Sequence, residues 1–272
     1  MSGVSLTLDP RMAEILRLIA AQDLPPYESM SGAQARAAAE ERNRFWNEGN
    51  PEVGRVREAT FPGPAGAMRL RLYEPEGVAP VSPAILYLHG GGWVICSLDT
   101  HDGVCRRLAN AARVKVASLD YRMAPEHPYP APLEDCVAAA RGLRSHGREL
   151  GIDPDRVALA GDSAGANLAL AALLALRDAG QTLSRAAALI YGVFSADLES
   201  PAHQRFGGGD IEWRQSGEIA EQRRGERVGA PGRVRHVLIP EPAHGGSGED
   251  ILAAAKALMR GRLEIGRKHA VD

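Results

Sequence analysis

The sequence contains few cysteines, and their spacing excludes two common uses of that residue. Only three of the 272 residues are cysteine: Cys96, Cys105 and Cys136. An odd number with no C-x-x-C pair argues against both a disulfide framework and a zinc cluster. We therefore expect three reduced thiols, as in a cytoplasmic protein.

An excess of one charge and a long apolar run are also absent. Lys and Arg total 32 and Asp and Glu total 34, a formal net charge of −2 with no long single-sign run. This balance argues against a phosphate-binding surface, so nucleic acid is not an expected partner. No segment approaches the roughly 18 apolar residues of a membrane span, and residues 1–10 lack the pattern of an export signal. With 44% hydrophobic and 24% charged residues, the composition is typical of a folded globular protein.

The first fifty residues show the pattern of two helices followed by a hairpin. Asp9 is a suitable N-cap and Pro10 suits the first helical position, while Ser31 is a suitable start for a second helix ending near Trp46. The apolar residues of the first helix recur at the spacing of one helical face: Met12, Ile15, Leu16 and Ile19. Further along, apolar Met68, Leu70 and Leu72 alternate with Arg69, Arg71 and Tyr73, which predicts a half-buried antiparallel strand.

From residue 84 onward, short apolar runs alternate with helical segments. The runs at 84–88, 114–119, 157–160 and 187–191 predict strands, and 133–145 and 164–176 predict helices. This alternation indicates an α/β fold whose mostly parallel sheet is covered by helices on both faces. Ligand sites in such folds lie outside the carboxyl ends of the strands.

Residues 199–233 interrupt this alternation. Eight of these 35 residues are apolar and twelve are charged, too polar for a strand buried on both faces, so we expect a loop or an exposed helix. A last strand at 234–239 and a last helix at 249–260 are expected after it.

A G-x-S-x-G motif, Gly161-Asp162-Ser163-Ala164-Gly165, stands between a predicted strand and a predicted helix. The glycines allow a sharp turn that exposes the serine hydroxyl and leaves the next backbone N–H near the positive end of the helix. The alternative is a glycine-rich turn whose serine is passive.

A second glycine-rich motif, His89-Gly90-Gly91-Gly92-Trp93, follows the predicted strand at 84–88. Consecutive glycines allow several N–H groups to point at one oxygen, as an oxyanion hole requires. A simple hinge does not explain its place at a strand end. Neither G-K-S/T nor G-x-G-x-x-G follows, which argues against a phosphate or dinucleotide loop.

These two motifs, with DYRMAPEHPYPAPLED at 120–135, resemble the hormone-sensitive-lipase-like family of α/β-hydrolases, which includes bacterial carboxylesterases. The resemblance covers roughly residues 1–205. It implies a helical cap over residues 1–50 and an α/β-hydrolase core over 51–272, irregular or shortened at about 199–233.

The same resemblance implies roles for individual residues. Ser163 corresponds to the nucleophile, and the N–H groups of Gly91, Gly92 and Ala164 correspond to the oxyanion donors. His89 and Asp162 occupy structural motif positions rather than places in the triad, and residues 120–128 support the site.

The triad order of this fold is Ser, acid, His, so the general base is expected late in the chain. His244 lies just after the last predicted strand and matches the family's His-Gly turn. It is preferred to His203, to His236, which falls inside the strand pattern, and to His269, which is near the terminus.

Asp210 is the expected acid of the triad. The segment 210–218 resembles the family's D-x-x-R-x-x-G-E stretch with one residue too many, and Glu212 is the second choice. A solvated loop carboxylate is the alternative interpretation of both. Residues 204–209 cannot supply the strand that should precede the acid, which indicates an internal deletion. A missing strand would leave sheet edges unpaired and favour a homo-oligomer.

The predicted activity is hydrolysis of short-chain acyl esters through a serine acyl-enzyme, with a small-molecule ester as substrate and with no cofactor or metal. Two alternatives stay open. The same machinery would serve an amide, formamide or lactone hydrolase, and the altered C-terminal third would suit a catalytically impaired or ligand-binding protein.

Overall fold

A single sheet organises the part of the chain that the structure describes. The computed structural model describes residues 9–22, 25–181, 184, 186–194 and 236–238. Seven strands lie in the order β1-β2-β4-β3-β5-β6-β7. Their bounds are β1 (Arg55–Gly63), β2 (Gly66–Glu74), β3 (Ser82–Leu88), β4 (Lys115–Asp120), β5 (Ile152–Asp162), β6 (Ala187–Ile190) and β7 (His236–Leu238).

The predicted early hairpin is confirmed as β1 and β2, which pair antiparallel, and β2 also pairs antiparallel with β4. Met68, Leu70 and Leu72 are buried while Arg69 is exposed, as the period-two pattern predicts. The expectation that Tyr73 shares the polar face was wrong, because both faces of this strand end are covered. Tyr73 is completely buried in a cluster with residues of α3 (Asp102–Ala112).

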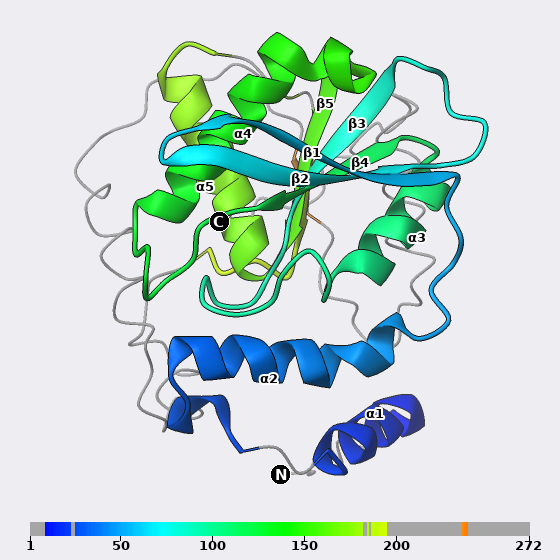
Figure 1. Ribbon diagram of the computed structural model, residues 1–272, viewed down its shortest axis with the longest axis vertical. Coiled ribbons are helices and arrows are strands. Elements are labelled where there is room, and N and C mark those ends of the chain that lie inside the picture. Colours follow the sequence, from blue (N-terminus) through cyan, green and yellow to red (C-terminus); the bar gives the residue numbers. More distant parts are fainter. Residues whose placement is uncertain (1–8, 23–24, 182–183, 185, 195–235, 239–272) are drawn as a thin grey trace, which may run out of the picture.

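The other strand pairs are parallel, and helices cover both faces of the sheet. Helices α4 (Ala131–His146) and α5 (Ala164–Asp178) pack on one face, and α3 packs on the other (Figure 1). The predicted α/β architecture is therefore confirmed, including the helices expected at 133–145 and 164–176. Helix α3 was not predicted. A short 3-10 helix, Gly147–Leu150, connects α4 to β5.

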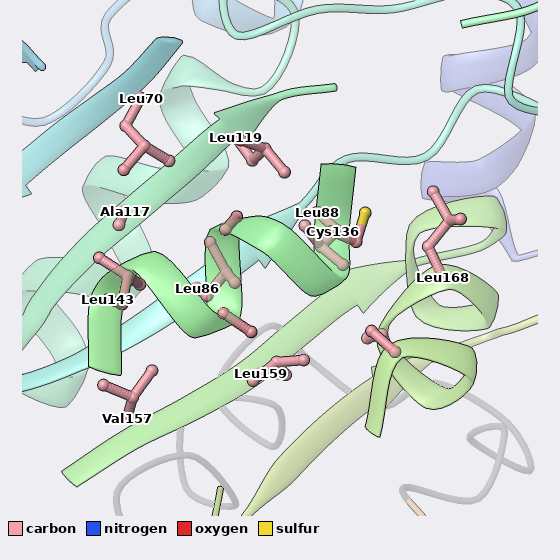
Figure 2. Close-up of a cluster of buried hydrophobic side chains, with 14 of the residues drawn as sticks. Leu70, Leu86, Leu88, Ala117, Leu119, Cys136, Leu143, Val157, Leu159 and Leu168 are labelled. Atoms are coloured by element: carbon pink, nitrogen blue, oxygen red, sulfur yellow. The ribbon is translucent and has the colours of Figure 1, made fainter. Parts of the chain in front are cut away.

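The main core lies between the sheet and the pair α4 and α5. Leu86, Leu119 and Leu159 point from three adjacent strands toward Cys136 and Leu143 of α4 (Figure 2). Each is completely buried. Burial of one leucine side chain contributes roughly 1.5–3 kcal/mol, so this layer fixes the strand ends on which the candidate site stands.

The two expected N-terminal helices are present as α1 (Pro10–Ala20) and α2 (Gly32–Arg44), with 3-10 turns at Tyr27–Ser29 and Phe45–Asn47. Asp9 caps α1 by accepting from Arg11 N, and Ser31 caps α2 in a reciprocal capping box with Gln34. Helices α1 and α2 both lie below the sheet in the view of Figure 1. The apolar stripe of α1 is not buried, because Met12, Leu16 and Ile19 are exposed.

The predicted last strand is present in part as β7, which pairs parallel with β6. The predicted loop at 199–233 and the predicted helix at 249–260 lie outside the described residues. No helix in the described ranges is both long enough and apolar enough to cross a bilayer.

Candidate active site

Ser163 stands on a sharp turn between β5 and α5. Its backbone has φ 50° and ψ −117°, a conformation that is strained for a residue with a side chain. Ser163 N donates to Ile190 O of β6 at 2.9 Å, which holds the turn against the neighbouring strand end. Ser163 is the N-cap of α5, yet its side chain makes no capping hydrogen bond. The hydroxyl is therefore not used by its own helix.

The glycines of the motif permit close contact between this turn and the end of β3. A Cβ atom at Gly165 would lie 1.9 Å from Leu88 O, and one at Gly161 would lie 2.5 Å from the same oxygen. Both distances are far inside van der Waals contact. Any side chain at either position would separate the serine turn from the loop that follows β3.

The loop after β3 contains the second glycine motif. Gly91 and Gly92 have φ values of 118° and 60°, which favour glycine. Gly91 O accepts from Val94 N at 3.1 Å and from Ile95 N at 2.9 Å, closing a tight turn. Among the described residues, nothing accepts a hydrogen bond from Gly91 N or Gly92 N. Within the described ranges, these two N–H groups are therefore without an intramolecular acceptor.

His89 supports this loop from the protein interior. Its Nδ1 lies 2.7 Å from Gly90 O, its ring stacks on Tyr121 at 4.4 Å, and Tyr121 Oη donates to His89 O at 2.7 Å. Burial, with the nearby His101 ring, lowers the pKa of His89 to about 4. His89 is thus a neutral, buried imidazole that contacts the backbone of its own loop. This fits the structural role that the family resemblance implies for it.

Asp162 joins the serine turn to the glycine loop. Its Oδ1 accepts from Gly90 N at 3.0 Å and from Tyr87 Oη at 2.8 Å, and its Oδ2 accepts from Tyr191 Oη at 3.0 Å. His101 Nε2 lies 3.3 Å from Oδ1. Burial raises the pKa of this carboxyl group, but the hydrogen bonds from His101, Tyr87 and Tyr191 outweigh it and hold the pKa at about 2. Asp162 is therefore an anion with its acceptor sites occupied, as a structural position requires.

The segment 120–135 braces the same region from outside. Arg122 binds the buried carboxylate of Asp135 with Nε and Nη2, at 3.0 and 2.8 Å from Oδ1, and its backbone N–H donates to Oδ2 at 2.9 Å. Ala124 N donates to Trp93 O at 2.9 Å. The chain that follows β4 thus holds the far end of the glycine loop.

Comparison with known proteins agrees with this geometry. Residues 85–222 match the family described as alpha/beta hydrolase fold. The chain belongs to this family. The expectation of a hormone-sensitive-lipase-like α/β-hydrolase is confirmed by the relatives that follow.

Two curated relatives of this α/β-hydrolase come from Mycobacterium tuberculosis. Esterase LipI is 48% identical over 133 residues, 48% of this chain and 41% of LipI. Carboxylesterase NlhH is 45% identical over 133 residues, 49% of this chain and 42% of NlhH. The matched region thus spans about two fifths of the length of these curated relatives.

Solved structures extend the similarity. An ester hydrolase, EH1AB1, from the metagenome of Lake Arreo is 37% identical with a TM-score of 0.71, covering 79% of this chain and 70% of that one. A hyperthermophilic esterase from Pyrobaculum calidifontis is 38% identical with a TM-score of 0.66, covering 70% of this chain and 61% of that one.

The structure describes only part of the site expected for this α/β-hydrolase. Ser163, Gly91, Gly92 and Ala164 are described, and the contact between Gly90 and Asp162 brings their two segments together. The expected base His244 and the expected acid Asp210 lie outside the described residues. The same is true of Glu212, His203 and His269, while the backbone of His236 lies in β7 as expected.

His101 was missed by the sequence analysis. It lies 61 residues before Asp162 and belongs to no motif, so only the fold reveals their contact. Within the described ranges, no group of three or more His, Cys, Asp or Glu side chains is arranged to hold a metal ion.

Proposed function

We propose that this α/β-hydrolase is a carboxylesterase that hydrolyses short-chain acyl esters through a serine acyl-enzyme. Two features carry the proposal: a Ser163 hydroxyl that makes no capping hydrogen bond on a strained turn, and N–H groups of Gly91 and Gly92 that have no acceptor among the described residues. The hydrogen bond from Gly90 N to Asp162 joins the two segments. Relatives named esterase or carboxylesterase support the choice of ester.

The proposed reaction has two halves. Ser163 Oγ attacks the ester carbonyl while His244 accepts its proton, and the carbonyl oxygen takes up negative charge facing the N–H groups of Gly91, Gly92 and Ala164. The alcohol leaves with the proton from His244, and the acyl group stays on Ser163. Water then attacks the acyl carbon while His244 accepts a proton from it. The bond between the acyl carbon and Ser163 Oγ breaks, His244 returns the proton to Oγ, and the acid leaves. Asp210 orients the imidazole.

The test is hydrolysis of p-nitrophenyl acetate and butyrate by the full chain. Ser163→Ala should lower kcat on the order of 10⁶-fold, and Asp210→Asn on the order of 10⁴-fold. Ser145→Ala, an exposed serine in α4, is the matched control and should have the wild-type rate. Equal rates in wild type and Ser163→Ala would contradict the proposal.

Two further measurements distinguish the esterase from the alternatives, which are a hydrolase of other bonds and a ligand-binding protein. A panel of amides, formamides and lactones tests other bonds for the same nucleophile. Intact mass after a fluorophosphonate probe tests whether Ser163 is activated at all, because only an activated serine gains the label. No adduct would favour a ligand-binding protein.

Three free thiols fit the proposed cytoplasmic location.

A further inference from the structure

The carboxylate of Asp162 collects its donors from four places in the chain. Gly90 N and Tyr87 Oη come from β3 and the loop that follows it, and Tyr191 Oη comes from the end of β6. His101, the N-cap of α3, approaches from the connection between β3 and α3. We call these five residues the Asp162 cluster. The carboxylate of Asp162, which directly precedes Ser163, thus binds the end of β3, the loop after it and the residue after β6.

His101 contacts both oxygens of this carboxylate. Its Nε2 lies 3.3 Å from Oδ1 and 3.4 Å from Oδ2, and the side chain is only 13% exposed. Because Asp162 is an acceptor only, the hydrogen in this contact must be on Nε2. A carboxylate held at both oxygens cannot rotate about its Cβ–Cγ bond without losing one contact.

The other ring nitrogen of His101 is also held. Nδ1 lies 2.9 Å from Thr100 Oγ1, and Thr100 Oγ1 is itself fixed by accepting from Ser97 N at 2.9 Å. A ring with a partner at each nitrogen has one orientation. The connection between β3 and α3 therefore aims Nε2–H at Asp162.

The orientation of Asp162 affects the glycine loop through Gly90. The N–H of Gly90 is committed to Oδ1, whereas those of Gly91 and Gly92 are unused in the described part of the chain. Adjacent peptide planes share a Cα atom, so a rotation of the Gly90 peptide redirects the N–H groups that follow. Glycine offers no side chain to resist that rotation.

We propose that His101 is a positioning residue, which acts through Asp162 and Gly90 to aim the oxyanion donors of the glycine loop. The inference rests on the proposed esterase function for its effect on catalysis. It assigns a role to a histidine that neither the motifs nor the triad include.

The test compares two substitutions at position 101. His101→Phe keeps a planar ring and removes the donor, whereas the amide nitrogen of His101→Gln can occupy the place of Nε2 and donate to Asp162. His146→Phe, at an exposed histidine at the end of α4, is the matched control. We would measure kcat and KM with p-nitrophenyl butyrate per active site titrated by a fluorophosphonate, so that loss of folded protein does not count.

His101→Phe should lower kcat about 10- to 100-fold with little change in KM, because a small misplacement of catalytic groups has effects of this size. His101→Gln should restore at least half of that loss on a logarithmic scale, and His146→Phe should match wild type. A kcat for His101→Phe within about twofold of wild type would overturn the inference, as would a His101→Gln variant no better than His101→Phe. If His101→Phe does not fold, His101→Leu removes the same donor.

A second readout does not depend on turnover. Amide hydrogen exchange at Gly90 should be faster in His101→Phe than in wild type and near wild type in His101→Gln, because the acceptor of Gly90 N–H is loosened only in the former. Unchanged exchange at Gly90 in His101→Phe would refute the positioning role. Lack of Ser163-dependent hydrolysis in wild type would instead refute the esterase proposal, and the exchange measurement would still decide on His101.

Discussion

The guanidinium of Arg36 in α2 donates to the carbonyl oxygen of Val94 at 3.0 Å, directly after the glycine loop. The same Nη1 donates to Ala124 O at 3.1 Å, and Nη2 pairs with Glu126. Helix α2 is thereby bound to two segments that frame the candidate site. Helix α2 is thus connected to the glycine loop by directional hydrogen bonds.

Removing this contact should weaken both the fold and the site. Hydrogen bonds from a charged donor contribute roughly 1.5–3 kcal/mol, so Arg36→Met should lower the free energy of unfolding by about 2 kcal/mol. It should also lower kcat/KM, because the glycine loop loses an outer support. Arg44→Met is the control on the same helix, since Arg44 pairs only with exposed Glu41 among the described residues. Urea denaturation of the two variants checks the prediction, and equal midpoints would contradict it.

Gly165 should not tolerate even a methyl group. A Cβ atom at this position would lie 1.9 Å from the backbone oxygen of Leu88. Because this oxygen belongs to the end of β3, it can move away only if the strand itself shifts. Gly165→Ala should therefore destabilise the protein by roughly 3 kcal/mol or more, as overpacking against backbone does. Gly180→Ala is the control: its φ is 70° but nothing lies within 4 Å, so only the backbone penalty of about 1 kcal/mol applies. Thermal or urea unfolding that gave both variants the same loss would argue against the close contact.

The strain at Ser163 should reverse the usual ranking of alanine and glycine. At most positions a glycine variant is less stable than the alanine variant, because the unfolded chain gains more conformational entropy with glycine. At φ 50° and ψ −117° glycine relieves strain, so Ser163→Gly should be more stable than Ser163→Ala by about 1 kcal/mol. At Ser145, inside α4, the order should be the normal one. Both Ser163 variants should be inactive, and a less stable Ser163→Gly would show that the turn is unstrained.

Because of His89, the stability of the protein should depend on pH in the mildly acidic range. Burial lowers the pKa of the folded imidazole to about 4, against 6.5 for the unfolded group. Between these values the unfolded state binds the extra proton, so the free energy of unfolding should fall as the pH is lowered from about 6.5 to 4, by on the order of 3 kcal/mol. His89→Asn should lose this slope, while His127→Asn, at an exposed histidine, should keep it. Urea titrations at several pH values measure the slopes, and parallel curves for wild type and His89→Asn would contradict the prediction.

Local patterns in the sequence predict much of this fold. The strands at 84–88 and 157–160 were visible as short apolar runs because β3 and β5 are buried on both faces, and the caps at Asp9 and Ser31 were visible because they act on the next few residues. Periodicity says nothing of what covers a helix, and the regular stripe of α1 is exposed. Helix α3 was missed.

In the candidate site, too, residues that form local sequence patterns were predicted and residues that act through distant contacts were not. Ser163 and the glycines were found because a sharp turn and a cradle of N–H groups each need several residues in succession. His101 and Tyr191 were not, since each serves the site by one contact with Asp162 across the fold, which leaves no local pattern.

The donors around Asp162 are spread along the chain, which affects when this cluster can form during synthesis. Tyr87, Gly90 and His101 leave the ribosome well before Asp162, and Tyr191 leaves after it, so the carboxylate cannot be enclosed until β6 has joined the growing sheet. A nascent chain ending before residue 191 would carry the serine turn without the hydrogen bond from Tyr191 to Asp162. The hydrogen bonds around Asp162 would therefore be complete only late in synthesis, well after the hairpin of β1 and β2 has emerged.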